Sequence, residues 1–278
     1  WLSDRLRSTA LGAVVAGISA VAFFAVVRAA PRSWWLWGWP AFSALTALMA
    51  FLWPVLIAPL FNRFEVLEDE ALARRALALS REAGVAVDRV LVADASRRTT
   101  TENAYVAGFG ATKRLVLYDT LVKAGDDDET LFVVGHELGH RAEGHIWKSL
   151  ALSSLGLLAG FAALAWLVSR GPLLSWAGAS SLADLRVIPA LLLFATLAGI
   201  VVLPFETAMS RRFEGRADEV AIELTGDADT AVRTFRRLAL NNLADLRPPD
   251  PAVWLLFTHP PTRERIGAVL TARRASEP

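Results

Sequence analysis

The sequence predicts a polytopic α-helical membrane protein with a small α+β lobe outside the bilayer. Hydrophobic residues make up 54% of the 278 residues, and the mean hydropathy is +0.39. The excess lies in four stretches without Asp, Glu, Lys, Arg or His, at 8–27, 33–62, 149–169 and 187–205. A bilayer core takes about 20 apolar residues in a helix. We therefore expect four transmembrane helices.

These stretches divide the chain into four parts. Residues 1–62 and 149–205 each hold two transmembrane helices, and 63–148 and 206–278 are aqueous segments. An even number of spans puts both aqueous segments on one side. Near the span ends, seven basic residues lie on that side (Arg5, Arg7, Arg63, Arg141, Lys148, Arg211 and Arg212) and four on the other (Arg28, Arg32, Arg170 and Arg186). The excess predicts a cytoplasmic lobe, at the bacterial inner membrane or at the endoplasmic reticulum of a eukaryote.

Composition excludes several functions. The 29 basic and 28 acidic residues give a net charge of +1 without a polybasic block, so nucleic-acid binding is not expected. The absence of cysteine excludes disulfides, thiolate metal sites, a cysteine nucleophile and prenylation of the chain itself. A metal would have to bind histidine and carboxylate. The chain begins with Trp1 and no signal peptide precedes the first span, so further spans are expected upstream.

Local patterns indicate the elements of the aqueous segments. In the first segment, 68–83 reads as an amphipathic helix and 85–95 as a strand, and 103–108 with 113–118 read as a hairpin. The acidic run 126–129 lacks the spaced ligands of a calcium loop and instead indicates the start of a long helix. In the second segment, we expect helices at 207–224 and 227–244, a proline-rich turn at 248–251, and a last helix from about Pro261.

Three of the four histidines lie within ten residues. His136, Glu137 and His140 form the pattern H-E-x-x-H, which on a helix puts two imidazoles one turn apart on the same face, with a carboxylate beside them. Two imidazoles in this position suit a tetrahedral zinc ion with an open site for water. Glu137 would accept the proton of that water. The alternative is a pair of structural histidines on a helix surface.

A catalytic zinc needs a third protein ligand. The metzincin spacing requires Gly at 143 and His at 146, and the chain has Glu143 and Ile146 there. His145 follows His140 by five residues, about 140° around a continuous helix, so it cannot share the metal face. We expect His145 either to contact a metal ligand without binding the metal itself or to lie at the membrane interface. The third ligand should be a carboxylate on another helix.

The membrane spans indicate which carboxylate it is. His140 precedes the third charge-free stretch by nine residues, and Glu214 follows the fourth by nine. If both helices are continuous, each side chain lies about 14 Å above the hydrocarbon edge. The two spans are antiparallel neighbours, so the matched heights favour Glu214 as the third ligand.

The other carboxylates near Glu214 are expected to have roles other than that of the third ligand. Asp218 lies one turn beyond Glu214 on the same face, where it can accept the outer N–H of a zinc-bound imidazole. Glu206 lies too close to the membrane edge to be the third ligand, and Glu223 fits a solvated helix face. The alternative for Glu214 and Asp218 is a salt-bridged surface with neighbouring arginines.

Several separated motifs together resemble the CAAX prenyl protease 1 family, membrane-embedded zinc peptidases of the gluzincin type. The motifs are Pro59-Leu60-Phe61-Asn62, Asn103-Ala104-Tyr105 leading into Gly108-Phe109-Gly110, His136-Glu137-Leu138-Gly139-His140, Ser210-Arg211-Arg212-Phe213-Glu214 with Ala217-Asp218, and His259-Pro260-Pro261 with Glu264-Arg265. The resemblance implies a zincin-like lobe and seven spans, of which the four here are similar to the last four.

It also implies the roles of individual residues. His136, His140 and Glu214 would bind one zinc ion and Glu137 would be the catalytic base. Asn103, His259 and Arg265 would contact the substrate backbone or the transition state, with His259 a candidate to stabilise the oxyanion. From the residues alone, Asn103 also fits a turn, and His259 also fits a cap.

The sequence thus predicts a zinc-dependent endopeptidase that cuts a peptide or protein substrate, lipidated or not, near the cytoplasmic membrane face. Two alternatives are a stress-type membrane metalloprotease for quality control of membrane proteins and a catalytically silent zinc-binding scaffold. Glu137 argues against the scaffold, because structural zinc sites use four protein ligands and need no base.

Overall fold

The computed structural model describes residues 2–108 and 110–276, so Phe109 of the glycine motif lies outside the described residues. The chain forms two compact units. One holds the chain up to Ala50 together with Trp147–Leu203, and the other holds Phe51–Ile146 and the chain from Pro204 onward. We call them the helical unit and the lobe.

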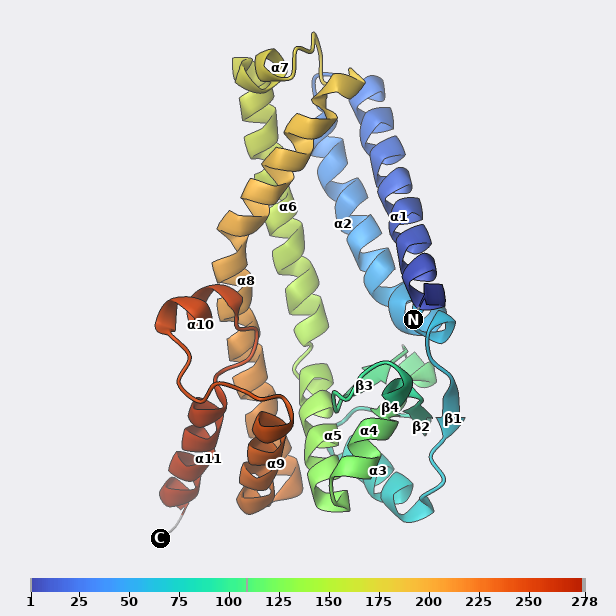
Figure 1. Cartoon of the computed structure of the whole chain (residues 1–278), viewed down its shortest axis with the longest axis vertical. Helices are drawn as coiled ribbons and strands as arrows, with labels where there is room; N and C mark the ends of the chain where they lie inside the picture. Colours follow the sequence, from blue (N-terminus) through green and yellow to red (C-terminus); the bar gives the residue numbers. More distant parts are fainter. Residues whose placement is uncertain (1, 109, 277–278) are drawn as a thin grey trace. The chain divides into compact units, whose positions relative to one another are not determined.

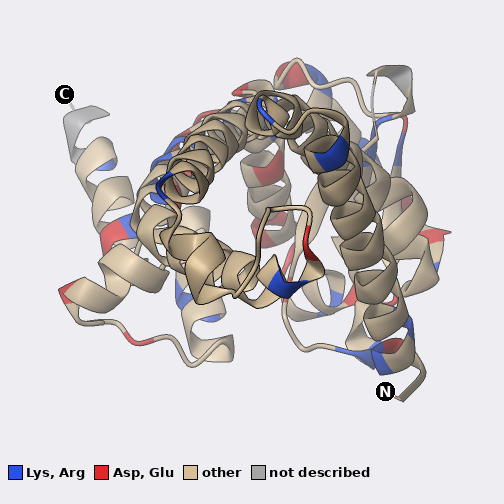
Figure 2. Cartoon of the chain, turned by 90° about the horizontal axis from the view of Figure 1, so that it is seen from above, with Lys and Arg blue, Asp and Glu red and all other residues tan. Residues whose placement is uncertain are grey.

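The helical unit is built from long apolar helices (Figure 1). They are α1 (Leu2–Ala29), α2 (Trp34–Leu52), most of α6 (His145–Arg170) and the first part of α8 (Ile188–Thr225), with the short α7 (Pro172–Trp176) after α6. Four helical segments of the described chain are long and apolar enough to cross a membrane: Leu2–Ala29, Trp34–Leu60, His145–Arg170 and Leu185–Thr225. In Figure 2 the apolar stretches of these helices are drawn almost entirely in tan. The four expected membrane helices are confirmed.

Aromatic and polar contacts join the helices of this unit. Trp34 is buried, with its ring centroid 6.0 Å from that of Phe161. The indole Nε1 of Trp39 donates to the backbone oxygen of Ser154 on α6 at 2.9 Å. The hydrophobic effect does not drive helices together inside a bilayer. Packing and hydrogen bonds such as these therefore determine which helices associate.

The lobe contains a four-stranded sheet in the order β1-β2-β4-β3. Its strands are β1 (Phe64–Val66), β2 (Arg89–Ala93), β3 (Ala104–Ala107) and β4 (Arg114–Tyr118). β3 and β4 form the antiparallel hairpin that the sequence predicts. β2 and β4 pair in parallel, which matches the continuous burial of residues 115–117 in the middle of β4. β1 is not predicted, because three residues carry too little pattern.

Helices cover this sheet (Figure 1). They are α3 (Glu70–Glu82), α4 (Asp119–Ala124) and α5 (Asp127–Ala142), and α5 packs against α3, β3 and α9 (Ala228–Asn241). The side chain of Asp126 accepts from the Glu129 amide at 2.8 Å, so the acidic run does cap α5. After α9 come α10 (Asp250–Leu256), where the sequence analysis expected only a turn, and α11 (Thr262–Ser276).

One premise of the sequence analysis is wrong. The helix that carries His140 does not continue into the third span: α5 ends at Ala142, Gly144 adopts φ +65°, and α6 begins at His145. A left-handed residue ends a helix, and glycine adopts this conformation without a Cβ clash. By contrast, α8 is continuous from Ile188 to Thr225 and carries Glu214 directly.

The close crossing of α5 and α8 positions the site. Gly135 and Gly139 on α5 face Ala221 and Ala217 on α8, both pairs four residues apart and in antiparallel order. A Cβ built on Gly139 would lie 3.1 Å from both Cα and the carbonyl oxygen of Ala217. Small residues at this spacing let two helix backbones approach closely.

We predict that Gly139→Ala destabilises the protein by about 1–3 kcal/mol, because its methyl group meets the backbone of α8 rather than a flexible side chain. Gly267→Ala is the matched control on α11, where a Cβ meets nothing within 4 Å. That change should stabilise the helix by about 0.5–1 kcal/mol. Thermal unfolding of both purified variants measures the difference. Equal melting temperatures would show that the crossing tolerates a methyl group.

Candidate metal centre

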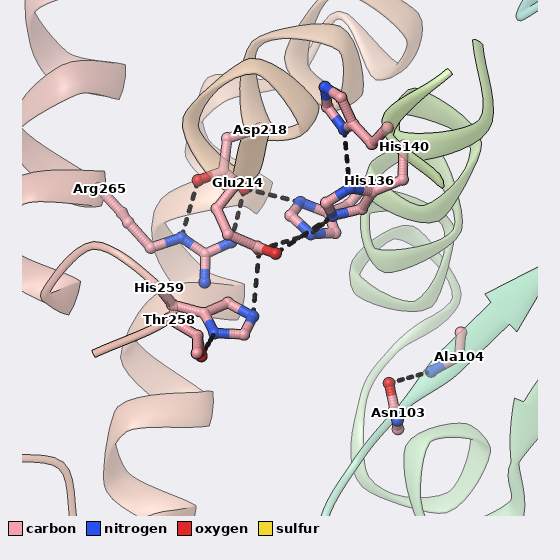
Figure 3. Close-up of polar contacts among 10 residues, drawn as sticks. Asn103, Ala104, His136, His140, Glu214, Asp218, Thr258, His259 and Arg265 are labelled. Carbon is pink, nitrogen blue, oxygen red and sulfur yellow. Dashed lines mark hydrogen bonds and ion pairs between the residues drawn. The ribbon is translucent and has the colours of Figure 1, made fainter. Parts of the chain in front are cut away.

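The lobe brings together three potential metal ligands from two helices (Figure 3). His136 and His140 lie on consecutive turns of α5, and Glu214 extends toward them from α8. Nε2 of His136 lies 3.1 Å from Nε2 of His140 and 3.1 Å from Oε2 of Glu214. Nε2 of His140 lies 3.4 Å from Oε1 of Glu214. All three side chains thus point their ligand atoms into one space.

The spacing of these atoms fits a tetrahedral metal ion. Ligands about 2.0–2.1 Å from zinc lie about 3.3 Å from one another at tetrahedral vertices, close to the observed 3.1–3.4 Å. Oε2 of Glu214 lies 3.1 Å from Nε2 of both His136 and His259, yet this buried oxygen has no hydrogen-bond partner. A cation would satisfy it. Two imidazoles and one carboxylate are also a common donor set of a catalytic zinc.

A buried carboxylate holds His136 from the other side. Oδ1 of Asp218 lies 2.8 Å from Nδ1 of His136, the contact that the helix spacing predicts. Arg265 on α11 donates to both oxygens of Asp218, from Nε at 2.7 Å and from Nη2 at 2.5 Å. The guanidinium carbon of Arg265 also lies 4.1 Å from the ring centroid of Phe235. Arg265 is therefore bound within the lobe through Asp218.

Two groups on α5 have raised pKa values. Burial disfavours a charged His136 imidazole, but its hydrogen bond to Asp218 and the nearby Glu214 carboxylate raise the pKa of His136 to about 9. Burial raises the pKa of Glu137, and the charge of Glu214 adds to this effect. A glutamate with a raised pKa is a better proton acceptor at neutral pH than an ordinary one.

The remaining predicted residues lie at different places. His259 contacts Glu214 and has Nδ1 3.0 Å from the Thr258 hydroxyl. Asn103 immediately precedes β3, and its side-chain oxygen accepts from the Ala104 amide at 2.9 Å. Figure 3 shows no hydrogen bond or ion pair between Asn103 and the histidine cluster. The structure thus brings His259 into the cluster and gives Asn103 the local turn contact.

The sequence analysis missed two features of this site. It assigned Arg265 to the substrate and did not pair it with Asp218, since residues 47 positions apart give no local signal. The second feature is the close helix crossing at Gly135 and Gly139. A close helix crossing could have been predicted from the sequence. Both α5 and α8 carry two small residues four positions apart, the glycines of α5 and the alanines of α8.

An H-E-x-x-H helix whose histidines face a glutamate from a second helix is the ligand arrangement found in zinc metalloproteases. The chain belongs to peptidase family M48, whose sequence model matches residues 66–273. Residues 1–63 match the CAAX prenyl protease N-terminal domain of five membrane helices. The fold class and the family resemblance that the sequence predicts are confirmed.

Individual relatives agree. The chain is 35% identical to the uncharacterized metalloprotease YhfN of Bacillus subtilis over 96% of its own length and 63% of that protein. It is 35% identical to a CAAX prenyl protease 1 homolog of Dictyostelium discoideum over 81% of the chain and 53% of that protein. The crystal structure of Ste24p from S. mikatae superposes with a TM-score of 0.87 at 26% identity, over 97% of this chain and 66% of the other. The chain thus spans less than two thirds of these relatives.

Proposed function

We propose that the chain is a zinc-dependent endopeptidase that hydrolyses peptide bonds beside the membrane. The observation that carries the proposal is the convergence of His136, His140 and Glu214 at the ligand spacing of tetrahedral zinc. One zinc ion bound by these residues would polarise the scissile carbonyl and lower the pKa of a water molecule. Family membership implies a metal cofactor and supports this assignment.

The residues around the ligands take the other steps. Glu137 accepts the proton of the attacking water and passes it to the leaving amine, a role that its raised pKa favours. His259 donates a hydrogen bond to the oxyanion from Nε2, which points at the cluster. Asp218 fixes the ring of His136, with Arg265 holding the carboxylate in place. Arg265 is therefore proposed as a positioning residue and not as a substrate ligand.

The edge of the sheet supports a peptide substrate. β3 is the last strand in the order and packs beside α5, the helix of the two histidines. An extended peptide adds to such an edge through its backbone, so substrate binding needs little side-chain specificity. Asn103 at the start of β3 would contact that peptide backbone. The names of the relatives extend the proposed substrates to prenylated CAAX peptides.

The positive charges near the span ends support a cytoplasmic lobe. The chain has no cysteine, so single-cysteine variants can test this orientation cleanly. We predict that Ala124→Cys in the lobe resists membrane-impermeant thiol reagents in intact cells, whereas Ser180→Cys between α7 and α8 reacts. Cell lysis should make both positions react. If only position 124 were labelled in intact cells, the lobe would lie on the outer side of the membrane, opposite to the proposal.

Metal analysis tests the ligand set. The parent protein should hold one zinc ion per chain, and Glu214→Ala should lose it because a site with two protein ligands binds far more weakly. Glu223→Ala is the matched control, since this exposed carboxylate lies on the same helix and forms an ion pair with Arg216, away from the histidines. It should keep the full zinc content. Full zinc occupancy in the Glu214 variant would exclude Glu214 as a ligand.

Peptide hydrolysis tests the base. Glu137→Gln preserves the shape of the side chain but cannot accept a proton, so turnover should fall about 10²-fold or more while zinc content is unchanged. Glu143→Gln, at the end of the same helix and ion-paired with Arg216 at 2.9 Å, should cleave at the parent rate. If the Glu137 variant were as active as the parent, the protease mechanism would have to be abandoned.

A further inference from the structure

The second histidine of the motif has both of its ring nitrogens engaged. Nε2 of His140 faces His136 and Glu214 within the proposed metal site. Its other nitrogen, Nδ1, lies 2.9 Å from Nδ1 of His145, the third histidine of the cluster. His145 has no role in the function proposed above.

This contact has only one arrangement that suits a metal ligand. A neutral imidazole carries one proton, so His140 can offer a lone pair at Nε2 only if Nδ1 holds the proton. That N–H then donates to Nδ1 of His145, whose own proton must lie on Nε2. His145 thus selects the form of His140 that has its free lone pair facing the site.

The fold holds His145 in this position. The residue is 5% exposed, and its ring stacks on Phe213 with centroids 4.3 Å apart and an interplanar angle of 15°. Phe213 immediately precedes Glu214 on α8, so one helix supplies both a proposed ligand and the surface that orients the acceptor. The left-handed turn at Gly144 replaces the continuous helix, in which His145 would lie about 140° from His140.

We propose that His145 is a positioning residue for His140: it accepts a hydrogen bond from the Nδ1–H of His140 and so fixes which nitrogen of His140 binds the metal. The inference rests on the zinc site proposed above. It makes the two histidine ligands unequal, because His136 is oriented by a carboxylate and His140 by a neutral ring. A carboxylate also raises the basicity of its ligand, whereas a neutral imidazole contributes mainly direction.

The test compares two substitutions in the full-length protein. His145→Phe keeps a ring to stack on Phe213 but offers no acceptor, and His145→Gln offers a carbonyl acceptor without the aromatic stack. Zinc affinity is measured by competition with a chelator. The Phe variant should bind zinc about 10- to 100-fold more weakly than the parent, the usual effect of losing such a partner. The Gln variant should recover most of that loss.

Two further readouts separate positioning from general damage. The melting temperature of the zinc-free His145→Phe variant should match that of the zinc-free parent, and the visible absorption of Co²⁺ in the site should shift. Gly144→Ala should weaken zinc binding through the displaced turn, whereas Gly84→Ala, at a glycine with φ +66° that ends α3, should lower only the melting temperature.

The outcomes distinguish the two proposals. A parent protein that binds no zinc would overturn both of them. A parent that binds zinc, together with a His145→Phe variant of equal affinity, would overturn the role of His145 alone. A Gln variant as weak as the Phe variant would also reject the acceptor role, because a restored acceptor would then have recovered no affinity.

Discussion

The close approach of α5 and α8 is the constraint on which the site depends. Two histidines on one helix cannot form a catalytic zinc site, so the third ligand must come from a second backbone within side-chain reach. Gly135 and Gly139 carry no side chain and meet Ala221 and Ala217 of α8, so the two helix backbones lie close together at these contacts. Since the helices are antiparallel, Glu214 falls beside the two imidazoles and Asp218 beside the outer nitrogen of His136. The same four positions thus place both the proposed ligand Glu214 and the carboxylate of Asp218 that contacts His136.

Buried charge around this crossing is balanced by arginines from the C-terminal helices. Asp218 is paired with Arg265, so burying the carboxylate does not leave an isolated charge beside His136. Two turns before His136 on α5, Glu129 pairs with Arg237 of α9, which also pairs with Glu102. Glu102 immediately precedes Asn103 and β3, so this second cluster ties the start of the edge strand to α5 and α9. The strand proposed to bind substrate and the helix that carries the histidines are therefore linked by charge as well as by packing.

Much of this could be predicted from the sequence. Absence of charge over about 20 residues is a strong signal, and the four spans follow from it. The H-E-x-x-H pattern and the spacing of Glu214 from the fourth span bring together three residues that the structure also clusters. The matched heights predict Glu214 even though α5 ends at Ala142 and does not continue into the third span. The pairing of Arg265 with Asp218, the parallel pairing of β2 with β4 and the short β1 could not be predicted, since they depend on residues far apart in the sequence or on very short segments.

The two helices that meet at the site differ in how they are joined to their membrane spans. This difference determines where residues can be inserted without changing the helical register of the site residues. On α8 the charge-free stretch and Glu214 belong to one unbroken helix. Inserting a single residue between Phe205 and Glu214 would turn the part of α8 that carries the carboxylate by about 100° relative to the apolar part of the same helix, and would lengthen the helix by about 1.5 Å. On the other helix, the left-handed turn at Gly144 interrupts the register, so an added residue in α6 beyond His145 need not rotate His136 or His140. Related chains should therefore vary in length after this turn and keep a fixed count of residues along α8.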